Sequence, residues 1–152
     1  MTGFLPSDNT DREQATAINN LSFFPAVSVS DLEKAFSIPK EISNSVAVNL
    51  LILALSEVNR ALSSYVFDKE EMGILSLDMA AQQDKIANAE SLYKTAIYAK
   101  AKALLMKESN ALGRQPNKEN DANEFKQDSF EEISTSAINQ ILGRGRISFE
   151  LI

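Results

Sequence analysis

The longest apolar run in the sequence extends from Val46 to Leu55, and Asn49 is its single polar residue. Wound at ~100° per residue, apolar side chains of the surrounding segment 42–65 fall on nearly all sides of a helix, which is typical of a buried helix. The run is shorter than the ~20 apolar residues of a membrane span. The pattern therefore predicts a core helix over most of residues 41–65, ending near residues 65–67. Other copies of the protein are a second possible cover for part of its surface.

Residues 82–108 predict a second long helix. Ile86, Tyr93, Ile97 and Leu104 fall on one face, and five alanines favour a helix that a partner can approach closely. The lysines make this helix basic within an acidic protein. Two interpretations stay open: a solvated face, or a surface that faces DNA in a lumen. The lysines concerned are Lys85, Lys94, Lys100, Lys102 and Lys107.

A third long helix is predicted to grow out of the acidic stretch 118–132, which carries six acidic and two basic side chains. The acidic residues lie in the early turns, where the helix dipole favours them. Gly143 is well placed as the residue that closes the helix. The expected inner face consists of positions spaced by four, widened by three further apolar residues. The series is Phe125, Ser129, Ile133, Ala137 and Ile141, and the additions are Phe130, Ile138 and Leu142.

Shorter elements fill the rest of the chain. Residues 28–37 predict a short helix capped by Ser28 or Ser30, and Pro39 is expected early in the next helix, with Ser37 as its cap. Residues 68–73 read as a polar connection. Residues 74–82 fit either a loop or an early helical start.

Two aromatic rings precede a proline near the N-terminus. Residues 1–20 are polar and turn-rich, which predicts a mobile segment. Next come Phe23, Phe24 and Pro25, and the proline pushes Phe24 towards extended geometry. Two interpretations stay open here: a hydrophobic clamp onto the protein's own core, or an arm that packs on a neighbouring subunit.

The chain ends in a different pattern. Ile147, Phe149 and Leu151 alternate with Ser148 and Glu150, and this period of two suits a β-strand. A lone strand in a helical protein must find its backbone hydrogen bonds in water or in another protein's sheet. The fold class predicted is therefore all-α, a small helical bundle with two long helices, shorter ones, and an extended, strand-like C-terminal tail.

The amino-acid composition excludes most kinds of catalytic and metal-binding site. The chain contains neither histidine nor cysteine, which excludes the common nucleophilic triads, disulfides and ordinary zinc sites. We expect no enzymatic activity, no cofactor and no metal; a carboxylate site for Mg²⁺ or Ca²⁺ in residues 118–132 is the one exception left open. The net charge of −6 argues against a general nucleic-acid binder. The absence of cysteine fits a reducing cytoplasm, and without a signal-peptide pattern secretion by that route is not expected.

Four segments in this order resemble one family, the head completion proteins of temperate contractile-tailed bacteriophages, which are head-to-tail connector adaptors. The resemblance covers nearly the whole chain from Asn20 onward and lies in the order and spacing of the segments. They are Phe23-Phe24-Pro25, Asn59-Arg60-Ala61-Leu62, Ser91-Leu92-Tyr93-Lys94-Thr95-Ala96-Ile97 and Ala137-Ile138-Asn139-Gln140-Ile141-Leu142-Gly143-Arg144-Gly145-Arg146.

The resemblance implies a structural virion protein that is made in the host cytoplasm. The resemblance implies that copies of the chain form a ring beneath the portal, with the portal's symmetry, after DNA packaging. It also implies that the ring helps to retain the genome and gives tail-side components a surface to attach to. The implied partners are the portal protein, a tail-side connector or terminator protein, other copies of the chain and, without sequence specificity, DNA in the channel; no membrane is involved. The alternative is a small helical dimer with a regulatory or binding role.

On this basis three regions are expected: a mobile segment 1–20, a helical adaptor domain 21–143 and a docking tail 144–152. The portal-binding residues are expected in the tail: Arg144, Arg146, Ile147, Ser148, Phe149, Leu151 and Ile152. Subunit contacts are assigned to Phe23, Phe24 and Pro25. A DNA- or subunit-facing surface is assigned to Lys94, Lys100 and Lys102.

Overall fold

The computed structural model describes residues 18–39, 41–112 and 118–144. In these residues the chain forms six helices and no strand, which confirms the all-α prediction. The expected mobile segment lies mostly outside the described residues, as does the tail from residue 145. The helices are α2 (Val29–Ala35), α3 (Asn44–Ala61), α4 (Ser63–Glu71), α5 (Leu77–Asp84), α6 (Ala89–Leu112) and α7 (Lys118–Ile141).

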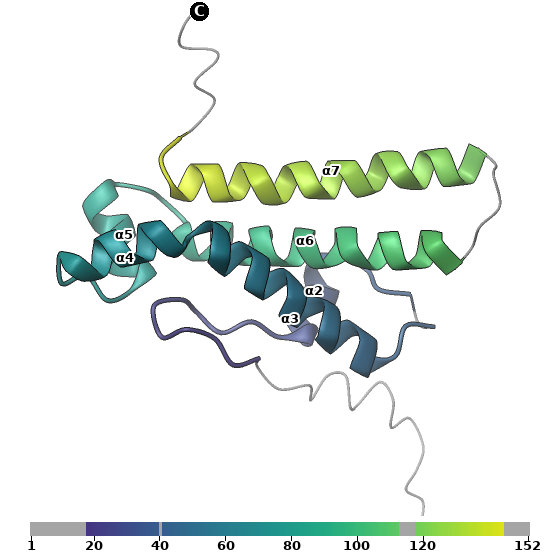
Figure 1. The fold of residues 1–152 in the computed structure, drawn as a ribbon, viewed down its shortest axis with the longest axis horizontal. Coiled ribbons are helices and arrows are strands. Elements are labelled where there is room, and N and C mark those ends of the chain that lie inside the picture. The colour runs from purple at the N-terminus through teal and green to yellow at the C-terminus, as the bar shows by residue number, and fades with distance from the viewer. Residues whose placement is uncertain (1–17, 40, 113–117, 145–152) are drawn as a thin grey trace, which may run out of the picture.

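Helix α6 is the centre of the bundle. Helices α2, α3, α5 and α7 all pack against it. Figure 1 shows α6 and α7 side by side and antiparallel along the long axis, with α3 crossing α6 and with α4 and α5 gathered at one end. The second predicted long helix therefore takes the most enclosed position in the bundle.

The α6–α7 pair is held by small residues. Ala96, Ala99 and Ala103 of α6 are fully buried, so the two helices approach closely, as the alanine pattern predicted. The buried Ser134 Oγ donates a 2.7 Å hydrogen bond to the Ala96 carbonyl oxygen. This bond fixes the position of α7 along α6.

The inner face of α7 differs from the predicted series spaced by four. Ala137 and Ile141 are buried as expected, but Ile133 is 40% exposed. Each step of four residues turns the helix by about 40°, so five such positions drift through about 160° and cannot all face inward. Ser134 belongs to the real inner face, and Phe130, which was expected to widen that face, packs edge-on against Phe36.

The predicted core helix is two helices. α3 ends at Ala61, α4 begins at Ser63, and their axes differ by 55°. The Ser63 hydroxyl donates a 2.8 Å hydrogen bond to the Arg60 carbonyl oxygen, a type of contact that bends helices, and Leu62 is fully buried at the bend. Among the described residues no single helix is long and apolar enough to cross a membrane; only the bent pair α3 and α4 has the necessary length and composition when taken together.

The predicted helix over 82–108 also divides. α5 ends with Lys85 in the left-handed conformation, and Asn88 takes the same conformation before α6 begins. The Ile86 amide donates back to the Ala81 carbonyl oxygen and so closes α5. Residues 77–82, part of the stretch 74–82 that the pattern left open between loop and helix, are helical.

The polar connection predicted over residues 68–73 is wrong for residues 68–71, which belong to α4. Lys69 lies within α4 and is buried; its Nζ donates to Gln83 Oε1 at 2.6 Å and pairs with Asp84 Oδ1 at 2.7 Å. These contacts clamp α4 to α5. Gly73, with φ of +81°, takes the left-handed conformation that ends α4.

Serine caps set where α2 and α3 begin. Ser28 caps α2 by accepting a hydrogen bond from the Asp31 amide, as predicted. For α3 the cap is Ser43, which accepts from the Val46 amide, and not Ser37; Pro39 lies outside the helix. The prediction for Pro39 was wrong because a second serine lies closer to the apolar run.

The segment 18–27 is a strap across the bundle. Ile18 and Val27 form an antiparallel bridge, and Asn20 joins a closed network with Tyr93 of α6 and Asn59 of α3. Phe24 stacks on Tyr93 with ring centroids 4.2 Å apart. Residues 18–20 therefore belong to the bundle, although the sequence pattern grouped them with the N-terminal segment.

The three tyrosines of the chain predict an alkaline transition. Burial, aided by the charge of Asp84, raises the pKa of Tyr65 to about 12. Burial is also the main cause that raises the pKa of Tyr98 to about 12. The pKa of Tyr93 is raised further, again mainly by burial. Above the ordinary value of 10.0 an unfolded chain loses these protons while the folded protein holds them, so the free energy of unfolding falls as pH rises from 10 towards 12.

In an alkaline titration we expect the absorbance of ionised tyrosine to appear at the same pH at which the helical circular dichroism is lost. That pH should be higher than the pH at which the tyrosines of the urea-unfolded chain ionise. Tyrosine ionisation at the ordinary pH with the helical signal intact would contradict this prediction.

Candidate interaction surfaces

The three lysines assigned to one DNA- or subunit-facing surface do not lie together. At about 100° per residue, Lys94, Lys100 and Lys102 point to different sides of α6. Lys94 pairs with Glu90 on its own helix at 3.2 Å, and Lys102 Nζ donates to the Ser37 carbonyl oxygen. Each therefore contributes to a different local contact within the subunit.

Lys100 joins three helices. Its Nζ lies 3.2 Å from Glu57 Oε2 of α3 and 2.7 Å from Glu131 Oε2 of α7. Burial alone would lower the pKa of Lys100, but the hydrogen bonds and charges of the two carboxylates raise it. For Lys102, burial and the neighbouring Lys126 lower the pKa. Lys100 is thus a partly exposed structural cation that bridges three helices.

Phe23 and Phe24 are 3% and 6% exposed within their own subunit. Phe23 packs edge-on against Tyr65, and its carbonyl oxygen accepts a hydrogen bond from the Leu77 amide. Both rings pack into the core of their own subunit, as the first of the two interpretations predicted. They offer almost no side-chain surface to a neighbouring subunit. Pro25 is partly exposed.

The outer face of α3 carries exposed apolar side chains that the described residues of the subunit do not cover. Leu51, Ala54 and Val58 are buried against the bundle, but Ile52 and Leu53 are exposed, Leu53 by 54%. The prediction of a helix buried nearly all round is therefore correct for one side only. We define the outer face of α3 as Val46, Asn49, Ile52, Leu53, Ser56 and Arg60, all exposed.

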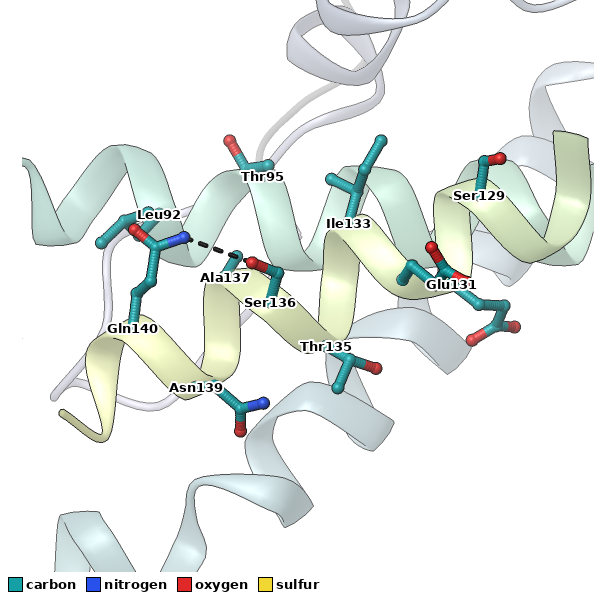
Figure 2. A pocket seen from close by; sticks show the side chains of 11 residues that line it. Leu92, Thr95, Ser129, Glu131, Ile133, Thr135, Ser136, Ala137, Asn139 and Gln140 are labelled. Carbon is teal, nitrogen blue, oxygen red and sulfur yellow. Dashed lines mark hydrogen bonds between the residues drawn. The ribbon is translucent and has the colours of Figure 1, made fainter. Parts of the chain in front are cut away.

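A shallow, open depression of about 1060 Å³ lies along the outward side of α7, with α6 at its edge (Figure 2). Leu92 and Thr95 contribute from α6, and the residues from α7 lie between Ser129 and Gln140. Figure 2 shows Thr95 and Ile133 on the same side of the helix pair, and the Gln140 amide donating to the Ser136 hydroxyl. Glu131 and Glu132 are the charged residues in its lining.

A third apolar surface lies at the end of the bundle formed by α4 and α5. Its large side chains come from one short stretch of sequence and are at least half exposed: Phe67, Met72, Leu75 and Met79. The exposed acidic residues Asp68, Glu70, Glu71 and Asp78 accompany them.

Helix α7 ends in a hydrogen-bonded C-terminal cap. Gly143 has φ of +73°, its amide donates to the Gln140 carbonyl oxygen, and the Arg144 amide donates to that of Asn139. This pair of bonds is the Schellman arrangement and confirms the cap predicted at Gly143. Arg144 is exposed and is the last described residue. The other predicted portal-binding residues lie outside the described residues.

No group of three or more acidic side chains able to hold a metal ion is found where the structure describes side chains. This finding does not reach the first part of the acidic stretch 118–132, because the side chains of residues 118–125 are not described.

Comparison with protein-family models matches residues 18–152 to the family described as phage head completion protein (GPL). Searches of curated proteins and of solved structures give no match.

Proposed function

Since the chain belongs to the phage head completion protein family, and is therefore a component of the phage head, we propose that it is a head-to-tail connector adaptor. In this proposal copies of the chain form a ring beneath the portal after DNA packaging. The ring stabilises the DNA-filled head and provides the surface to which the tail-side connector or terminator protein attaches. The function is structural and not enzymatic.

The observation that carries the proposal is the extent of the family match, which runs from the strap at Ile18 through the C-terminal tail. The arrangement of α7 supports a docking role for that tail, because the helix ends at Gly143 and does not continue into the last residues. We propose that Arg144 and Arg146 pair with portal carboxylates, for which the rigid guanidinium fork is well suited. Ile147, Phe149, Leu151 and Ile152 enter apolar pockets while the backbone, Ser148 included, adds a strand to a portal sheet.

The family match favours this role over a small helical dimer with a regulatory function. DNA contact inside the ring stays part of the proposal, but the dispersed lysines of α6 give it no common surface. Any such contact would therefore come from residues on other parts of the chain.

The proposal is tested with a phage that lacks this protein. We expect cells infected by it to accumulate heads without tails that package DNA and then lose it, and the wild-type chain supplied in trans to restore complete particles. Electron microscopy and nuclease sensitivity of the encapsidated DNA measure both effects. Infectious, tailed particles formed without the protein would overturn the proposal.

A further inference from the structure

The C-terminal end of α7 and the helices α4 and α5 lie at the same end of the bundle (Figure 1). The hydrogen bond from Ser134 Oγ to the Ala96 carbonyl oxygen sets the register of the antiparallel helices α6 and α7. Because both helices rise ~1.5 Å per residue, Ile141 of α7 lies level with Ala89, the first residue of α6. α5 directly precedes α6 in the chain and packs against it. The C-terminal tail therefore starts at the end of the bundle that carries α5.

Large apolar side chains are exposed at this end of the bundle. We call the exposed surface of α4, α5 and their connection the α4–α5 end. Gln83 Nε2 donates to the Met72 sulfur at 3.9 Å, and Met79 precedes Gln83 by about one turn of α5, so the two methionines lie close to the same amide. Phe67, which is 63% exposed, lies on another side of α4 with Glu71 about one turn away. Exposed methionines adapt well to a partner's surface.

The α4–α5 end is acidic. Residues 61–85 contain five acidic and two basic side chains. Of the two cations, Lys69 is buried and paired with Asp84, and Lys85 lines one depression together with Asp78. A partner that covers this end must therefore bring cations next to apolar surface. Three further carboxylates are exposed and form no ion pair within the part of the chain that the structure describes: Asp68, Glu70 and Glu71.

We propose that the α4–α5 end binds the portal protein, at an apolar site rimmed by lysine or arginine. This inference rests on the proposed docking of the C-terminal tail and states which end of the subunit faces the portal. Arg146 is two residues from Arg144, so the chain allows at most ~7 Å between them. Portal carboxylates that pair with both arginines are therefore held at the end of the bundle that carries α5. The opposite end, where α6 ends and α7 begins, then faces away from the portal.

The absence of native cysteine allows a direct test by photocross-linking. Leu75→Cys places one thiol at the α4–α5 end, where Leu75 is 62% exposed. The purified variant is labelled with a maleimide benzophenone, bound to DNA-filled heads that lack the protein, and irradiated. We expect a covalent adduct with the portal protein, identified with an antibody against the portal and by mass spectrometry. The matched control is Lys107→Cys, also exposed but about 27 Å along α6 from Ala89, and it should give no portal adduct.

A label in the tail tests the proposed function separately. Ser148→Cys should link to the portal whichever end of the bundle lies nearer to it. If it does, but Leu75→Cys links only to another copy, only within its own chain or to nothing, the inferred contact is wrong and the proposed function stands. Portal adducts of equal yield from Leu75→Cys and Lys107→Cys would also overturn the inferred contact. If neither Ser148→Cys nor Leu75→Cys links to the portal, the proposed docking of the tail is wrong as well.

Charge reversal covers the case in which the label itself blocks binding. The unlabelled double variant Glu70→Lys, Glu71→Lys should lower the amount that sediments with heads at least about tenfold, because its lysines meet portal cations. Lysine near the C-terminal end of α4 is favoured by the helix dipole, so the fold should be kept. The control Glu108→Lys, Asp128→Lys changes the net charge equally at exposed positions in the other half of the bundle and should bind like the wild type. Equal binding of the two double variants would overturn the inferred contact.

Discussion

Replacing Tyr93 by alanine is expected to lower the free energy of unfolding by ~3–5 kcal/mol, which is typical for removing a fully buried aromatic side chain. Tyr93 is fully buried, stacks on Phe24 at an interplanar angle of 4°, and joins the strap to α6 and α3 through Asn20 and Asn59. The change removes the stacking partner and leaves two asparagines short of hydrogen bonds. Urea denaturation followed by circular dichroism measures the loss, and a change below about 1 kcal/mol would contradict the prediction.

A pair of phenylalanine variants separates the network from the packing. The Tyr93 hydroxyl donates to Asn59 Oδ1 at 2.6 Å and accepts from Asn20 Nδ2 at 3.0 Å, so Tyr93→Phe is expected to cost ~1–3 kcal/mol. Tyr98→Phe is the matched control, because both hydrogen bonds of the Tyr98 hydroxyl are 3.4 Å long and therefore weak. If Tyr98→Phe destabilises as much as Tyr93→Phe, the closed network is not what holds the strap.

The existence of the helices is readable from the sequence, but their interruptions are not. Alanine and leucine content and apolar periodicity place helical segments correctly over residues 44–67 and 89–108, whereas residues 68–71 were predicted as a connection and are helical. The bend at Leu62 and the break at Lys85 contain neither glycine nor proline, the residues that usually mark such points. Both are set by tertiary contacts: the burial of Leu62, and the Lys69–Asp84 pair that holds α5 against α4.

The same limit applies to surfaces. Lysines counted along one helix suggest a basic surface, but a helix surrounded by neighbours sends them to different contacts, as Lys94 and Lys100 demonstrate. A depression such as that along α7, with α6 at its edge, depends on how two distant segments pair, which no local pattern records. The sequence does contain one indication that α3 exposes apolar surface. Its residues 42–56 are fifteen successive uncharged residues, and a helix with a single buried face does not need so many apolar side chains.

Removal of residues 145–152 is expected to abolish the joining of the protein to filled heads while leaving the bundle intact. Truncation after Arg144 keeps both capping bonds, from the Gly143 amide to Gln140 and from the Arg144 amide to Asn139. α7 therefore retains its C-terminal end, and helical circular dichroism and the melting temperature should not change. Binding is measured by sedimenting purified DNA-filled, protein-deficient heads with wild-type or truncated protein.

Two further variants show which part of the tail acts in this binding. The triple change Ile147→Ser, Phe149→Ser, Leu151→Ser keeps the length and charge of the tail but removes its apolar side chains, so it should bind as poorly as the truncation. The double change Arg144→Ala, Arg146→Ala should weaken binding less at high salt than at low salt, because salt screens the lost ion pairs. If the tail instead packs over the bundle, the truncation removes the burial of three large side chains worth ~1.5–3 kcal/mol each, and the melting temperature must fall by many degrees. That fall, with head binding retained, would contradict docking on the portal.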